Sequence, residues 1–211
     1  MIRQKFLVTY RFLLVFIVLT GLIFNFIGRN LIETMVFFTI QSNLLALIIL
    51  SIQGYFLFKG KRMYQEYPIL LTIKHIIMMN LIITFLGFHF LLRRTLLDDP
   101  SGYLTSVENI LLHYLVPILF VFDYLFFDKK RHLSLKSIPL FLIYPYAYLL
   151  FVIIRAELGG ILLTVNSRYP YFFLDIDTLG FNMIFYVLAM TIFFTFMAFL
   201  LFKIDQIFSK T

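Results

Sequence analysis

The sequence predicts an all-α integral membrane protein: a bundle of six transmembrane helices with a partly immersed segment over its outer face. Hydrophobic residues make up 62% of the 211 residues, and they gather in runs long enough to cross the roughly 30 Å hydrocarbon core of a bilayer. Because backbone polar groups in lipid must be satisfied internally, these runs should be helices. The runs lie at residues 6–27, 34–58, 68–92, 107–127, 138–154 and 181–202.

The connections between the runs are too short for a separate soluble domain, so residues 1–211 are expected to form one membrane domain. The first run exceeds the 7–15 apolar residues of a secretion signal and carries Arg11, which predicts a retained first helix. The longest connection, residues 156–180, contains an apolar piece too short to span and is punctuated by Gly159, Gly160 and Pro170. This composition favours a partly immersed cap over a free loop.

Charge is distributed unevenly between the two sides of the predicted bundle. The net charge is +7, but the Lys and Arg residues concentrate at the termini and in alternate loops. This is the positive-inside bias, which predicts cytoplasmic N- and C-termini and excludes a nucleic-acid interface as the reason for the basic charge. The chain has no cysteine, which excludes thiolate chemistry. The basic loop residues are Lys59, Lys61, Arg62, Lys129, Lys130, Arg131 and Lys136.

Two polar side chains lie at matching depth in the second and fourth runs. Thr39 is predicted about 8 Å below the outer end of its helix, and His113 about 9 Å below the outer end of its own. Both helices run inward, so the two side chains should lie in the same leaflet. A hydroxyl beside a histidine is the minimal nucleophile–base unit for acyl transfer.

Further polar residues share the helix faces of this pair. Ser42 and Asn43 follow Thr39 at helical spacing, and Asn109 precedes His113 by one turn. The amides of Asn43 and Asn109 are candidates to stabilise an oxyanion, and His89 near the outer end of the third run is a candidate third member. A metal site is not expected, because the histidines are not at ligand spacing.

Structural explanations compete with each of these functional ones. A threonine in a membrane helix commonly bonds the carbonyl four residues earlier. A buried histidine can serve a structural hydrogen bond, and His89 can be an interfacial residue. On the cytoplasmic side, Asp123 needs a partner within the membrane, and Lys74 or Arg11 can supply one in a structural ion pair or in a proton relay.

Three ordered motifs resemble those of a known family. Phe37-Phe38-Thr39 looks like the F-L-T element of the androgen-induced, androgen-dependent and FAR-17a-like membrane proteins. Asn109-x-x-x-His113 before Pro117 resembles their N-x-x-x-H element, and the string from Tyr169 to Asp175 is similar to their Y-P-F-L-E/D element. Bacterial members are known as predicted six-pass proteins, so the resemblance also implies a bacterial plasma membrane.

The resemblance implies a lipid esterase. Animal members hydrolyse fatty acid esters of hydroxy fatty acids with a threonine and a histidine, which correspond to Thr39 and His113. It implies membrane lipids and a lipid ester as partners, and no cofactor. The gap from histidine to proline is one residue shorter than in the animal members, and the polar residues at 41–43 differ. The substrate and the oxyanion-binding groups therefore stay open.

The remaining motif residues also have two interpretations. Tyr169 can belong to an interfacial tyrosine belt or help to close the site, and Asp175 and Asp177 would orient His113 if the outer segment folds inward. The alternative to an esterase is a membrane protein without catalysis: a small-molecule transporter, a lipid-binding protein or a scaffold. Transport is disfavoured because the sequence contains no internal repeat and no matched pair of broken helices.

Overall fold

The computed structural model describes residues 2–97 and 102–208, and within these ranges the chain is helical, with one isolated β-bridge and no strand. Six of its helices are long and apolar enough to cross a membrane, which indicates a multi-pass membrane protein and agrees with the predicted number. The six candidate spans are Lys5–Phe26, Phe38–Phe58, Pro68–Leu96, Val107–Phe127, Leu135–Leu158 and Ile176–Ile207.

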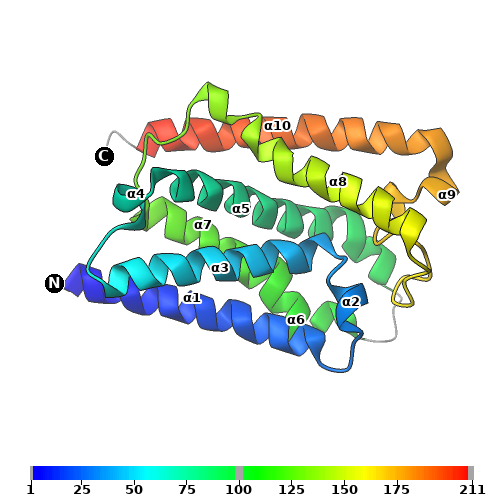
Figure 1. Ribbon diagram of the computed structural model, residues 1–211, viewed down its shortest axis with the longest axis horizontal. Helices are drawn as coiled ribbons and strands as arrows, with labels where there is room; N and C mark the ends of the chain where they lie inside the picture. Colours follow the sequence, from blue (N-terminus) through cyan, green and yellow to red (C-terminus); the bar gives the residue numbers. More distant parts are fainter. Residues whose placement is uncertain (1, 98–101, 209–211) are drawn as a thin grey trace.

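The long helices lie side by side along the long axis of the molecule (Figure 1). Helix α3 packs against both α1 and α5, α5 packs against α7, and α8 and α10 flank α5 on the other side. The start of α1 and the end of α10 lie at one end, here called the terminal end, whereas α2 and α9 lie at the opposite, loop end. The long helices are α1 (Ile2–Phe26), α3 (Phe38–Phe58), α5 (Pro68–Gly87), α7 (Val116–Phe127), α8 (Leu140–Leu158) and α10 (Met183–Ile207).

Short helical turns connect the long helices or extend them. Some of these turns continue a span, and others lie in the connections at either end of the bundle. They are α2 (Leu31–Thr34), α4 (Met63–Glu66), η1 (Phe88–Leu92), η2 (Arg93–Leu96), η3 (Tyr103–Thr105), α6 (Val107–Ile110), η4 (Leu111–Leu115), η5 (Leu135–Ser137), η6 (Phe172–Leu174), α9 (Ile176–Leu179) and η7 (Gly180–Asn182).

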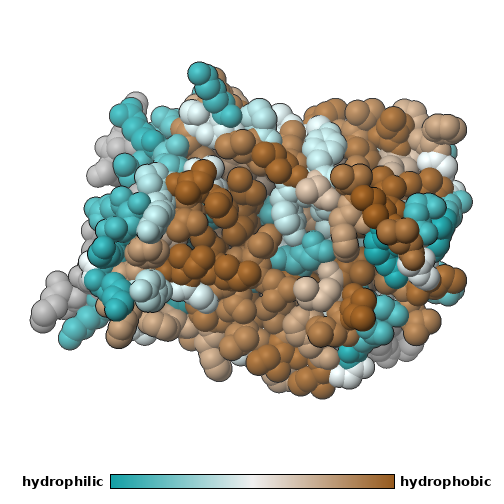
Figure 2. Space-filling view, viewed as in Figure 1, coloured by the Kyte–Doolittle hydropathy of each residue, from teal (hydrophilic) through white to brown (hydrophobic). Residues whose placement is uncertain are grey.

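Polar and apolar residues are distributed over the surface in the pattern expected of a protein that lies in a bilayer. Figure 2 shows polar residues gathered at both ends and a broad apolar surface between them. The last span is the most exposed, with 11% of its apolar window buried against 50% for the second and third spans. Helix α10 is therefore held by few contacts, while α3 and α5 form the centre of the bundle.

The second span begins later than the sequence predicted. We expected one helix from residue 34, but α2 ends at Thr34 and α3 begins at Phe38 after a turn. The backbone at Phe37 is extended, and the Tyr148 hydroxyl donates to the Val36 carbonyl at 3.0 Å. That carbonyl is thereby satisfied outside a helix, which allows the break. Thr39 consequently lies in the first turn of α3 and not one and a half turns below its start.

The fourth span changes its winding next to a proline. Helix α6 is followed by the π-helical turn η4, and α7 then begins at Val116. Pro117 has no N–H group and its ring would clash with the carbonyl of residue 113 in a regular α-helix. A wider turn removes that clash, and such π turns frequently occur at functional sites. Gly21 of α1 packs on this turn so closely that a Cβ there would lie 2.6 Å from Leu112.

The fifth helix is longer than predicted. It continues through Pro145 to Leu158, four residues beyond the expected end at residue 154. Arg155, Ala156 and Glu157 are compatible with a helix, and Gly159-Gly160 then ends it. Hydrophobicity alone ended the predicted span too early, because the last turn is partly polar.

The segment of residues 159–175 covers part of the loop end, and we call it the loop segment. A bridge between Leu162 and Ser167 closes a small turn, with Asn166 at a φ of 48°. Leu162 and Tyr169 are buried, while Leu163 is exposed. Asparagine tolerates such a left-handed backbone better than most residues. The loop segment is thus folded onto the bundle through a few apolar anchors.

At the terminal end, four charged side chains form a buried charge cluster. Arg11 bonds Asp123 at 2.8 Å and Asp128 at 3.0 Å. Lys74 pairs with the same two carboxylates, at 2.6 Å for Asp128. The expected pairing of Asp123 is therefore confirmed with both cations, and Asp128 is a member that the sequence analysis missed. Two positive and two negative charges balance.

Candidate functional site

Thr39 and His113 meet near the loop end. The Thr39 hydroxyl oxygen lies 3.1 Å from Nε2 of His113, and both side chains are at least nine-tenths buried. With the ring proton on Nδ1, Nε2 accepts a hydrogen bond from the hydroxyl. This geometry allows a histidine to withdraw the proton as the hydroxyl attacks an electrophile.

The π-helical turn η4 sets the direction of the histidine ring. His113 is the middle residue of this turn, and its ring packs on Phe88 with centroids 4.1 Å apart. Nδ1 makes no full hydrogen bond within residues 2–97 and 102–208, although the Asn109 carbonyl one turn earlier lies near the ring. The ring is therefore oriented by packing and by backbone, with Nε2 directed at Thr39.

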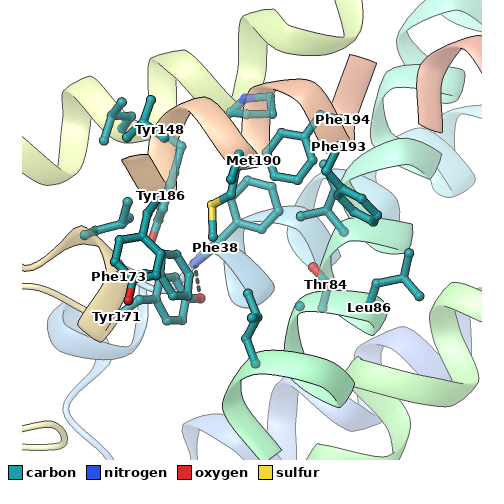
Figure 3. Close-up of a pocket in the computed structure, with 18 of the residues that line it drawn as sticks. Phe38, Thr84, Leu86, Tyr148, Tyr171, Phe173, Tyr186, Met190, Phe193 and Phe194 are labelled. Carbon is teal, nitrogen blue, oxygen red and sulfur yellow. Dashed lines mark hydrogen bonds between the residues drawn. The ribbon is translucent and has the colours of Figure 1, made fainter. Parts of the chain in front are cut away.

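Thr39 also forms part of the wall of a cavity of about 430 Å³. Figure 3 shows this cavity with other residues of its wall labelled. The wall is built by α3, α5, η1, α8, α10 and residues 171–174, and most of it is Phe, Leu, Ile, Val and Met. Within the described residues, the wall includes Phe88 but not His113. A ligand in the cavity could thus reach the threonine hydroxyl while the histidine stays covered. The polar members of the wall are Thr39, Thr84, Tyr146, Tyr148, Tyr171, Tyr186 and Thr191.

The two polar residues that follow Thr39 on α3 have different environments. Asn43 donates from its amide nitrogen to the Thr39 carbonyl at 2.8 Å and to the Leu112 carbonyl at 3.3 Å. It therefore joins α3 to η4 and fixes the relative position of Thr39 and His113. Ser42 is fully buried, and its hydroxyl has no hydrogen-bond partner among the described residues. Neither residue lines the cavity.

Asn109 and His89 were also candidates from the sequence. The Asn109 amide donates to the Leu104 carbonyl at 2.9 Å, so its donor serves the start of the fourth span. His89 lies 3.3 Å from the Tyr114 hydroxyl and packs against Phe85, outside the cavity wall. Neither Asn109 nor His89 forms a hydrogen bond with the Thr39 hydroxyl.

The motif residues of the loop segment interact with one another. Tyr169 is buried, and its N–H donates to Ser167 at 3.1 Å. Asp175 accepts from Ser167 at 2.8 Å and caps α9, and Asp177 pairs with Arg168. The two carboxylates therefore stabilise the loop segment itself and do not orient His113.

Tyr171 is the site residue that the sequence analysis missed. Its hydroxyl oxygen accepts a hydrogen bond from the Phe38 N–H at 3.0 Å, drawn as the dashed line in Figure 3. It also lines the cavity beside Thr39. Tyr171 lies inside the Y-P-F-L-like string. The motif therefore predicted the correct segment, but the residues of that segment expected at the site were Tyr169 and Asp175.

Comparison with protein-family models, with curated proteins and with solved structures finds no match for this chain. Within the described residues, no group of three or more His, Cys, Asp or Glu side chains is placed to hold a metal ion. The three motifs and the geometry of the site are therefore the observations from which a function can be argued.

Proposed function

We propose that this protein is an intramembrane lipid ester hydrolase in which Thr39 is the nucleophile and His113 the general base. One observation carries the proposal: the same threonine whose hydroxyl bonds a buried histidine also lines an apolar cavity. A threonine with only a structural role would typically bond the carbonyl four residues earlier. Thr34 does so at 2.8 Å, and Thr191 does so at 2.7 Å.

The cavity favours a long-chain ester as the substrate, such as a fatty acid ester of a hydroxy fatty acid. Its volume of about 430 Å³ lies within the range of about 300–1,000 Å³ typical of ligand sites. Phe193, Phe194 and Met190 of α10 present apolar side chains to it, opposite the tyrosines of α8 and the loop segment (Figure 3). An acyl chain would thus lie between α5, α8 and α10, with its ester group at Thr39.

The reaction requires no cofactor. The Thr39 oxygen attacks the ester carbonyl carbon as its proton moves to Nε2 of His113, which forms a tetrahedral intermediate. The C–O bond of the ester then breaks, and His113 returns the proton to the departing alkoxide. Water attacks the resulting acyl-threonine, again losing a proton to His113, and a second tetrahedral intermediate releases the fatty acid and regenerates Thr39.

The orientation in the membrane follows from the Lys/Arg bias. With both termini in the cytoplasm, the cavity lies in the outer half of a plasma membrane and the loop segment is partly immersed above it. Lateral entry suits a substrate whose acyl chains already partition into lipid. Reporter fusions after Lys130 should be cytoplasmic, and fusions after Pro100, which lies outside the described residues, should be external. The opposite pattern would overturn this orientation.

Thr84 provides a matched control for the nucleophile. It is also a buried threonine of the cavity wall, but it has no hydrogen-bonded histidine. Purified protein in lipid nanodiscs should hydrolyse a long-chain fluorogenic ester. Thr39→Ala should lower kcat by at least about 10³-fold, whereas Thr84→Ala should stay within about tenfold. Equal activity of Thr39→Ala and wild type would refute the proposal.

A binding protein without catalysis would use the same cavity. It would retain a long-chain lipid through purification, show no hydrolysis above a lipid-only blank, and bind that lipid equally after Thr39→Ala. That set of results would replace the esterase proposal with the binding alternative.

A further inference from the structure

Hydrolysis at Thr39 needs hydrogen-bond donors for the negative oxygen of the tetrahedral intermediate. The amide groups that the sequence offered for this task are already used. Asn43 donates to two backbone carbonyls, and Asn109 donates to a third. Neither amide lines the cavity, so a donor from the cavity wall beside Thr39 is better placed.

Tyr171 has the required position. Its ring stacks on Phe173 with centroids 5.2 Å apart and contacts Phe37 edge-on at 6.0 Å. Its hydroxyl lies at the N-terminus of α3, where it accepts from the Phe38 N–H. The aromatic contacts on both sides fix the phenol against the first turn of α3, the turn that carries Thr39.

The proton of the Tyr171 hydroxyl is available for a ligand. Burial raises the pKa of Tyr171, so the phenol is neutral at physiological pH, although its contacts with Thr39 and Phe38 lower the pKa in part. Because the oxygen accepts from a backbone N–H at the positive end of a helix, its O–H is polarised and is a stronger donor. Because the Tyr171 oxygen acts as the acceptor toward the Phe38 N–H, its O–H hydrogen can serve as a donor to a ligand in the cavity that Tyr171 lines.

Tyr148 shows what a structural tyrosine does at this place. It also lines the cavity and lies near Tyr171, with ring centroids 6.4 Å apart. Its hydroxyl, however, donates to the Val36 carbonyl at 3.0 Å and fixes the turn before α3. The two neighbouring phenols thus differ in their bonds to the backbone: the Tyr148 hydroxyl donates to a carbonyl, whereas the Tyr171 hydroxyl accepts from an N–H.

We propose that Tyr171 is a catalytic residue that donates a hydrogen bond to the oxyanion formed when Thr39 attacks the ester carbonyl. This inference rests on the proposed esterase function. The carbonyl π bond breaks as the bond from the Thr39 oxygen to carbon forms, and the electron pair moves onto the former carbonyl oxygen. Tyr171 shares its proton with that oxygen without transferring it, while His113 holds the proton from Thr39.

The test compares Tyr171→Phe with Tyr10→Phe in nanodiscs. Tyr10 lies outside the cavity wall, and its hydroxyl donates to the Leu119 carbonyl at 2.6 Å. Loss of an oxyanion donor should lower kcat of Tyr171→Phe by about 10²–10³-fold, with KM within about threefold. A long-chain trifluoromethyl ketone forms a hemiketal with the threonine hydroxyl that carries the same negative oxygen, so its affinity should fall by a similar factor. Tyr10→Phe should lower the melting temperature while kcat stays within about threefold.

Each of the other outcomes contradicts either the role of Tyr171 or the proposed esterase function. A Tyr171→Phe protein with wild-type kcat, or with unchanged affinity for the ketone, overturns the role of Tyr171 while the wild-type activity still supports the esterase. A wild-type protein that does not hydrolyse esters removes the proposed function and this inference with it. If Tyr171→Phe does not fold, 3,5-difluorotyrosine at position 171 retains the shape with a more acidic phenol. It should bind the ketone several-fold more tightly, and unchanged affinity overturns the proposal.

Discussion

Two of the regions in which the bundle buries polar groups differ in the kind of partners that those groups have. In the buried charge cluster, Arg11 and Lys74 face two carboxylates, and the charges cancel. At the Thr39–His113 pair a hydroxyl bonds an imidazole, one ring nitrogen makes no hydrogen bond among the described residues, and Thr39 lines a cavity. Burial alone does not distinguish a structural site from a reactive one; a hydroxyl–histidine pair beside a cavity does.

Because of this difference, mutations in the buried charge cluster should change stability, whereas mutations at the Thr39–His113 pair should change turnover. Removing one partner of a balanced charge cluster leaves an uncompensated charge in the interior and should act on stability. Removing one member of a hydroxyl–histidine pair leaves no charge behind, so the fold should survive while chemistry is lost. Measuring both stability and turnover for each variant therefore distinguishes the structural region from the reactive one.

The largest expected effect is on turnover at the Thr39–His113 pair. His113→Ala should lower kcat by at least about 10³-fold, and the Thr39→Ala/His113→Ala double variant should be little worse than either single variant, because the two groups act as a unit. The comparison uses initial rates per mole of folded protein. Fully multiplicative losses in the double variant would show that the two residues act independently.

The next largest effect is on stability in the buried charge cluster. Asp123→Asn should lower the free energy of unfolding by about 3–5 kcal/mol, since Arg11 and Lys74 then share one carboxylate. Adding Lys74→Met restores charge balance and should recover part of the loss. Denaturation of purified protein gives both values, and specific activity should stay within about threefold. A stable Asp123→Asn protein without activity would instead indicate a proton relay.

A smaller loss is expected at Asn43, which lies close to the site but holds helices together. Asn43→Ala removes two hydrogen bonds to backbone carbonyls and should cost about 1–2 kcal/mol of stability. Its control on the same helix is Ser51→Ala, which removes one exposed bond to Leu47 and should change stability by less than about 0.5 kcal/mol. An unchanged Asn43→Ala stability would mean that other contacts hold η4 in place.

Much of this arrangement could be predicted from the sequence, because hydrophobicity and helical spacing are local properties. The six spans follow from apolar runs, and the placement of Thr39 and His113 toward the same end of the bundle follows from their positions near the starts of two helices that run in the same direction. The break before Phe38 could not be predicted, because it depends on Tyr148, more than a hundred residues away. Tyr171 was missed for the same reason: its value comes from contact with the first turn of α3, and no spacing along the chain reveals that contact.

The smallest effect should come from His89, which provides the closest internal comparison with His113. Each histidine lies in a π-helical turn, η1 for His89 and η4 for His113, but only His113 contacts a hydroxyl of the cavity wall. His89→Phe keeps the ring that packs on Phe85 and removes only the contact with Tyr114. We expect kcat within about twofold of wild type, because a part-buried hydrogen bond as long as 3.3 Å contributes little. A loss as large as that of His113→Ala would show that a histidine can act here without touching Thr39, and the contact with Thr39 would no longer identify the catalytic histidine.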